Sequence, residues 1–184
     1  VANAYRPESA AKRNARYEEG LSYVIANPSQ HNIQAMVNRH LRFSLWPYLR
    51  GCSQEVNPQQ NITVDQVTPE LKQQFTDCLL RSEQTALQRQ RENYATALNN
   101  LIAVQSDDHF NAAAQAGLRN DLYRYSATCQ DAVNPGSKTQ AAHVTGEMRT
   151  NFENCLVGNE TQHRQERNTN IALLGLCLVG LGFS

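Results

Sequence analysis

The chain has 184 residues, with 17 basic and 17 acidic side chains, so its formal net charge at pH 7 is zero. This length is enough to bury a hydrophobic core, either in one domain or in two small ones. The balanced charge argues against electrostatic binding of nucleic acid, which normally requires a basic excess or a basic stripe.

A single shift of 77 residues aligns much of the chain with itself, and such self-similarity indicates a repeat architecture. Under this shift Cys52 and Cys78 fall on Cys129 and Cys155, since 129 − 52 and 155 − 78 both equal 77. The matched positions are mainly apolar residues, Cys, Pro and Thr, so the repeat preserves a fold rather than an active site. We expect an all-α tandem duplication: unit 1 over residues 1–81, unit 2 over 82–158 and a partial third unit over 159–184.

The helices of unit 1 follow from apolar residues at helical spacing. A first helix is expected to start near Pro7 and to end at Asn27, because the residue before a proline disfavours helix. Ser29 can then cap a second helix that ends near Cys52. Its apolar face and the equivalent face in unit 2 comprise Ile33, Val37, Leu41, Leu45 and Tyr48, and Phe110, Ala114, Leu118, Leu122 and Tyr125.

A long helix is predicted over residues 69–104, because neither Pro nor Gly interrupts the chain between Glu70 and Val104. Thr68 and Pro69 are suited to the cap and the first position of this helix. It would close unit 1 and open unit 2, as in solenoids whose units join without a linker. By the same shift, the last helix of unit 2 should continue through residues 159–170 into the C-terminal segment.

The repeat also predicts how the cysteines pair, because equivalent cysteines should pair equivalently. This favours disulfides Cys52–Cys78 and Cys129–Cys155 over reduced thiols, and over a metal site, for which C-x-x-C spacing and recurring histidines are lacking. Disulfides predict an extracytoplasmic location, in the periplasm, at the cell surface or in a secreted protein. Two glycosylation sequons begin at Asn61 and Asn159.

The C-terminal segment lacks a polar face, and such a helix must be buried on all sides. It could be buried inside its own fold, against a second copy or partner protein, or in a membrane, although its 14 residues are too few to span a bilayer as a helix. Cys177 within it is expected to be a buried apolar residue. The predicted partner or oligomer interface comprises Ile171, Leu173, Leu174, Leu176, Leu178, Val179, Leu181 and Phe183.

Motifs for catalysis and for cofactor binding are lacking, so we expect neither an enzyme nor a cofactor. The richest aromatic cluster is Trp46-Pro47-Tyr48 with Phe43 nearby, which is interpreted as core and helix-end packing or as a partner-binding hot spot. The sequence favours a structural or assembly component that self-associates or binds cell-envelope proteins, such as secretion, pilus or surface-complex proteins. The alternative is a small periplasmic binding or inhibitory module, either of the immunity type or for an apolar ligand.

Overall fold

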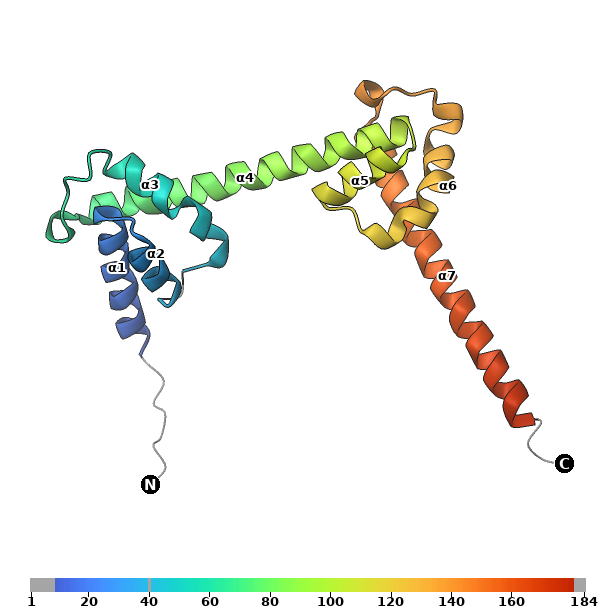
Figure 1. The fold of residues 1–184 in the computed structure, drawn as a ribbon, viewed down its shortest axis with the longest axis horizontal. Coiled ribbons are helices and arrows are strands. Elements are labelled where there is room, and N and C mark those ends of the chain that lie inside the picture. The colour runs from blue at the N-terminus through green and yellow to red at the C-terminus, as the bar shows by residue number, and fades with distance from the viewer. Residues whose placement is uncertain (1–8, 40, 181–184) are drawn as a thin grey trace. The chain divides into compact units, whose positions relative to one another are not determined.

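The computed structural model describes residues 9–39 and 41–180, and for Val37 and residues 170–180 it describes the backbone alone. All regular structure in these residues is helical, which confirms the predicted all-α class (Figure 1). The α-helices are α1 Ala10–Ala26, α2 Gln30–Val37, α3 Leu49–Val56, α4 Pro69–Ala103, α5 Asp107–Ala116, α6 Tyr123–Val133 and α7 Gly146–Gly180. The short 3-10 helices are η1 Phe43–Tyr48, η2 Val64–Gln66, η3 Asn120–Leu122, η4 Pro135–Ser137 and η5 Ala141–His143.

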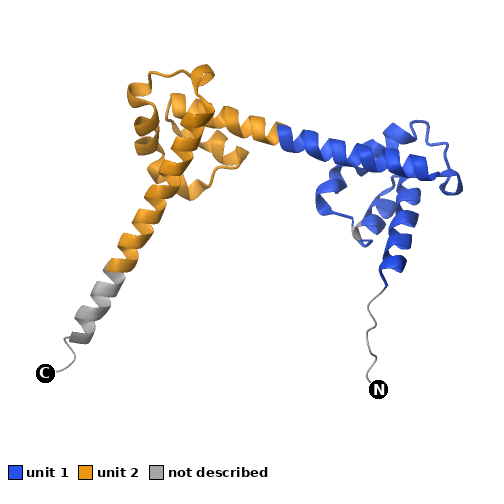
Figure 2. Cartoon of the chain, turned by 180° about the vertical axis from the view of Figure 1, so that it is seen from behind, with its two compact units in different colours: residues 1–88 blue, residues 89–184 orange. Residues whose placement is uncertain are grey.

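The chain forms two compact units, residues 1–88 and 89–184, which meet within α4 (Figure 2). The predicted helix over 69–104 is therefore present as α4, over Pro69–Ala103. Several elements start at the same place in both units after a shift of 77 residues: α2 and α5, η1 and η3, η2 and η5, and α4 and α7. The domain boundaries expected at 81/82 and 158/159 stay predictions.

Hydroxyl side chains start the helices as the sequence predicts. The Oγ atoms of Ser29 and Ser106 accept backbone hydrogen bonds at the starts of α2 and α5. Thr68 and Thr145 do the same at α4 and α7, each with an N···O distance of 3.2 Å. These caps satisfy amide groups that have no partner within the helix, so they fix where each helix begins.

The single second helix expected in each unit is wrong. In unit 1 the chain forms α2, η1 and α3 in succession, and in unit 2 it forms α5, η3 and α6. In unit 2, Gly117 takes a φ of +132°, which ends α5, and the amide of Leu118 turns back onto the carbonyl of Ala113 at 2.8 Å. In unit 1, Pro47 removes one amide donor from this stretch. The turn still places the predicted apolar residues Leu41, Leu45, Leu118 and Leu122 in the cores.

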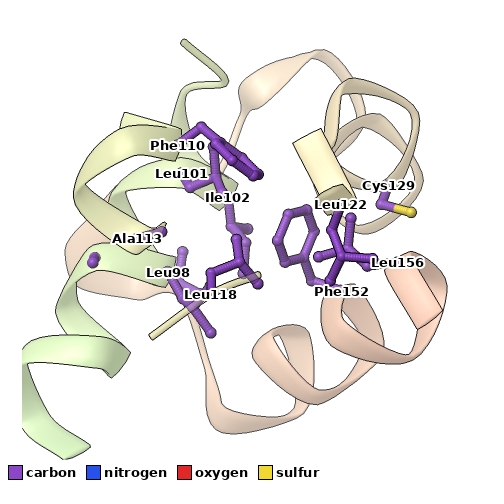
Figure 3. Packing of buried hydrophobic residues seen from close by; sticks show 12 residues of the cluster. Leu98, Leu101, Ile102, Phe110, Ala113, Leu118, Leu122, Cys129, Phe152 and Leu156 are labelled. Atoms are coloured by element: carbon purple, nitrogen blue, oxygen red, sulfur yellow. The ribbon is translucent and has the colours of Figure 1, made fainter. Parts of the chain in front are cut away.

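Each unit has its own hydrophobic core, and the two cores use matched positions. In unit 2, Phe152 of α7 lies among leucines from α4 and from the turn before α6 (Figure 3). Its equivalent Phe75 is fully buried in unit 1. Further buried pairs related by the shift are Leu21 and Leu98, Ile25 and Ile102, Leu41 and Leu118, Leu45 and Leu122, and Leu79 and Leu156.

The two predicted disulfides are both present. Cys52–Cys78 joins α3 to α4 and Cys129–Cys155 joins α6 to α7, with Cα–Cα distances of 5.7 and 5.6 Å. Each bond therefore attaches the short helix of a unit to the long helix that follows it, at a sequence separation of 26 residues.

A buried asparagine performs the same structural role in both units. Asn57 Nδ2 donates to the carbonyl of Ile25 at 3.1 Å, and Asn134 Nδ2 donates to the carbonyl of Ile102 at 2.9 Å. Each asparagine also accepts from and donates to one residue of the following loop, which is Ile62 in unit 1 and Thr139 in unit 2. These bonds connect the end of one helix to the loop before the next long helix and satisfy buried polar groups.

Candidate functional site

The two units differ in the side chains around an ion pair that is present in both. Arg42 lies just before η1 and donates to Glu83 of α4 at 2.7 Å. Arg119 lies just before η3 and donates to Glu160 of α7 at 2.6 Å. Since 119 − 42 and 160 − 83 both equal 77, the same interaction fixes the turn segment on the long helix in each unit.

In unit 1 this surface is apolar. Phe43 is 80% exposed, and its ring lies 5.2 Å from that of Trp46 between centroids. Leu80 and Leu87 are seven residues apart on α4 and share the face of Glu83, because residues at helical spacings of three, four and seven lie on one side. They are 45% and 49% exposed. We call Phe43, Trp46, Leu80 and Leu87 the aromatic patch.

Within this patch, Trp46 has a buried polar atom without a hydrogen-bond partner in the described structure. Its indole Nε1 is buried and has no hydrogen-bond partner among the described residues. A buried donor without an acceptor costs free energy, so the segment carries an unfavourable term as well as an exposed phenylalanine ring. Trp46 and Tyr48 are nevertheless packed against the core of unit 1.

In unit 2 a charged hollow lies next to the equivalent ion pair, and we call it the arginine cleft. It has a volume of about 190 Å³. Arg119 donates both to Glu160 and to Asp121, and Arg164 forms a second ion pair with Glu160 at 2.6 Å. The guanidinium of Arg124 lies 5.8 Å from the centre of the Tyr125 ring. The residues lining the cleft are Asp121, Arg124, Tyr125, Glu160, His163, Arg164 and Arg167.

The carboxylates of the cleft are held in their charged forms. Hydrogen bonds from Arg119 lower the pKa of Glu160 and the pKa of Asp121, and the positive charge of Arg164 acts in the same direction. The cleft therefore keeps its ion pairs at neutral pH and into the mildly acidic range. Its side chains can bind and orient a charged group, but a titratable acid–base pair is not formed by these two carboxylates.

The shift pairs unlike residues at five of the seven positions that line the cleft. Unit 1 has no charged residue at any of the five cleft positions that carry Asp121, Arg124, His163, Arg164 and Arg167 in unit 2. The residues 77 positions earlier are Ser44, Pro47, Ala86 and Leu87 of unit 1 and Gln90 just beyond it. Sequence reasoning missed the arginine cleft because it looked for what the two units share. The signal was present in the positions where the aligned units disagree.

The predicted interface in the C-terminal segment lies outside the described side chains. The backbone of α7 continues to Gly180, as the shift predicts. The side chains of Ile171, Leu173, Leu174, Leu176, Leu178 and Val179 are not described, and Leu181 and Phe183 lie outside the described residues. Within the described part of the chain, no helix is long and apolar enough to cross a membrane.

The two sequons lie in different environments. Asn61 is exposed in the loop between α3 and α4. Asn159 lies within α7, and its Nδ2 donates to the carbonyl of Cys155 at 2.9 Å and contacts both sulfurs of the Cys129–Cys155 disulfide at 3.4 and 3.5 Å. In unit 1 the Oγ of Ser82 takes the matched place beside its disulfide. Asn159 therefore packs against the disulfide. Its Nδ2, the atom to which a glycan would be attached, takes part in these hydrogen bonds.

Searches with this chain found no matching family model, no matching curated protein and no matching solved structure.

Proposed function

We propose that this chain is a non-enzymatic structural or assembly component that works outside the cytosol and binds a second copy of itself or other envelope proteins. The observation that carries this proposal is the aromatic patch, where a phenylalanine that is 80% exposed stands beside a tryptophan. Aromatic residues of this kind dominate the binding energy of protein interfaces. The apolar segment over residues 171–184 is proposed as a second binding element.

The proposal includes a tandem duplication of a unit of about 77 residues, as in a solenoid, with a partial third unit at the C-terminus. The matched helix starts, buried side chains, disulfides and Arg–Glu pairs support it. Solenoid units bury their surfaces against neighbouring units. The apolar segment over residues 171–184 would likewise need a neighbouring surface, which another molecule can supply.

The proposed location outside the cytosol rests on the disulfides. Such bonds persist in oxidising compartments and are rare where glutathione and thioredoxin keep thiols reduced. Mass spectrometry of protein taken from its native cells, alkylated without reduction, tests this proposal. We expect Cys52, Cys78, Cys129 and Cys155 to be unmodified, whereas alkylation of all four in the native protein would contradict it.

Sedimentation velocity tests self-association. We expect the full chain to sediment as an oligomer, and both a double variant Phe43→Ser/Leu87→Ser and a chain ending at Asn170 to shift towards monomer. The matched control is Val104→Ser, since Val104 is also an exposed apolar residue, at 53%, but belongs to unit 2, whereas the aromatic patch belongs to unit 1. Identical monomeric sedimentation of all four proteins would overturn self-association.

A further inference from the structure

We propose that the arginine cleft of unit 2 binds a doubly charged tetrahedral oxyanion, a phosphate monoester or a sulfate. This proposal goes beyond the assembly role and does not depend on it. The cleft is a hollow of about 190 Å³. Drug-sized ligands occupy pockets of about 300–1,000 Å³, so a small charged group is the better fit.

The charge of the cleft supports a dianion. Arg124, Arg164 and Arg167 line the cleft with the carboxylates of Asp121 and Glu160. Arg119 does not line it but binds both carboxylates, so the group as a whole carries two net positive charges when His163 is neutral. Arg119 and Arg164 are paired with Glu160. Neither Arg124 nor Arg167 has a carboxylate partner among the described residues. A ligand with two negative charges would therefore balance the two arginines that the protein leaves uncompensated.

The geometry favours binding by guanidinium groups. Arg119 is fixed by hydrogen bonds to Asp121 and Glu160, and Glu160 in turn orients Arg164. Tyr125 carries the guanidinium of Arg124 over one face and lies 6.4 Å from the ring of His163 between centroids. Partly fixed guanidinium groups lose less freedom on binding, and they match the oxygen spacing of phosphate and sulfate.

Unit 1 provides an internal comparison for this proposal. Its matched surface keeps the anchoring pair Arg42–Glu83 and the tyrosine Tyr48 but has Ala86, Leu87 and Gln90 in place of His163, Arg164 and Arg167. The fold of a unit therefore does not require the additional charges. Their presence in unit 2 alone indicates a role in binding.

Titration of the full chain with inorganic phosphate and with sulfate, followed by calorimetry and by the NMR signals of the arginine side chains, tests the proposal. We expect binding in the millimolar range or tighter. The variants Arg164→Leu and Arg167→Gln, which introduce the unit 1 residues, should each weaken it about tenfold or more. Arg50→Gln is the control, because Arg50 is an exposed arginine of unit 1, and it should leave the affinity unchanged.

A second arm distinguishes the source of the anion. Vesicles of phosphatidylcholine with and without phosphatidic acid are compared by co-sedimentation, with the Arg167→Gln variant as reference. Binding only to the phosphatidic acid vesicles, lost in the variant, would identify a lipid headgroup, and binding of free phosphate would identify a soluble ligand. No anion binding by the full chain, or equal binding by all variants with an unchanged circular dichroism melt, would overturn the proposal.

Discussion

The two units match closely in their cores and differ more at their surfaces. Phe75 and Phe152 are both fully buried, and the two disulfides join equivalent pairs of helices. Around the matched Arg–Glu pairs, unit 1 presents apolar side chains and unit 2 presents arginines. The difference teaches that the core and its covalent link define the unit, whereas its surface chemistry is free to diverge.

Removing one disulfide should produce the largest effect that separates the units. Each bond closes a ring of 27 residues, since 78 − 52 + 1 and 155 − 129 + 1 both equal 27. Cys129→Ala/Cys155→Ala should lower the free energy of unfolding of unit 2 by about 3–4 kcal/mol. Hydrogen exchange should accelerate in α6 and in the first turns of α7 and much less in α3.

The mirror variant, Cys52→Ala/Cys78→Ala, should accelerate exchange in α3 instead. Equal acceleration in both units by either variant would contradict the description of two separate cores and would indicate a single cooperative unit.

The buried asparagines should come next. Asn57→Ala and Asn134→Ala should each cost about 1–3 kcal/mol, because the loop amide and the helix-end carbonyl lose hydrogen-bond partners in a buried setting. Urea denaturation measures this, with the exposed Asn61→Ala as control. If Asn57→Ala and Asn134→Ala lowered the free energy of unfolding less than Asn61→Ala does, water would be shown to replace the lost side chain.

A smaller effect on stability is expected for the hydrogen bond of Tyr94, which is present in unit 2 alone among the described residues. The hydroxyl of Tyr94 donates to Glu153 at 2.7 Å, and its pKa is raised by burial and by this carboxylate. The matched residues in unit 1 are Tyr17 and Thr76, and Tyr17 forms no such bond in the described structure. Tyr94→Phe should cost about 1 kcal/mol and Tyr17→Phe close to nothing in urea denaturation. Equal costs would show that the hydrogen bond to Glu153 is not what distinguishes the two tyrosines.

The smallest effect concerns acid stability. The pKa values of Glu160 and Asp121 are lowered in the folded protein, so their contribution is present above the unfolded values, near pH 4, and is lost as the pH falls through the folded values. The difference in stability between the wild type and Arg119→Gln should therefore narrow below about pH 4. Thermal melts from pH 7 to pH 2.5 measure this, and a constant difference would contradict it.

Much of the fold could be predicted from signals in the sequence, several of which occur at matched positions of the two units. The caps at Ser29 and Thr68 and the pairing of the cysteines follow from signals present in both units. The long helix over 69–104 follows from the lack of Pro and Gly in that segment. The break between α2 and α3 was not predicted, because Leu41 and Leu45 continue the helical spacing through it, although Pro47 and, in unit 2, Gly117 mark it in the sequence. Leu41 and Leu45 are buried in the core from a turn and a short 3-10 helix rather than from one continuous α-helix.

The arginine cleft could be predicted only in part, because the positions where the aligned units disagree point to it but its geometry comes from packing. Arg124 and Arg167 lie 43 residues apart, and only the docking of the η3–α6 segment on α7 brings them into one hollow. Phe43 was identified from the sequence, but its exposure depends on where η1 meets α4. The spacing of residues along the chain does not predict how such elements pack against one another.

The rings closed by sulfur also affect how the protein withstands proteases. The exposed loop between α3 and α4 lies inside the Cys52–Cys78 ring, and the loop between α6 and α7 lies inside the other. Loops of this type are preferred cleavage sites. A peptide bond cut in either loop would leave both fragments covalently joined, so a nicked molecule would keep its mass on a non-reducing gel and retain its paired helices.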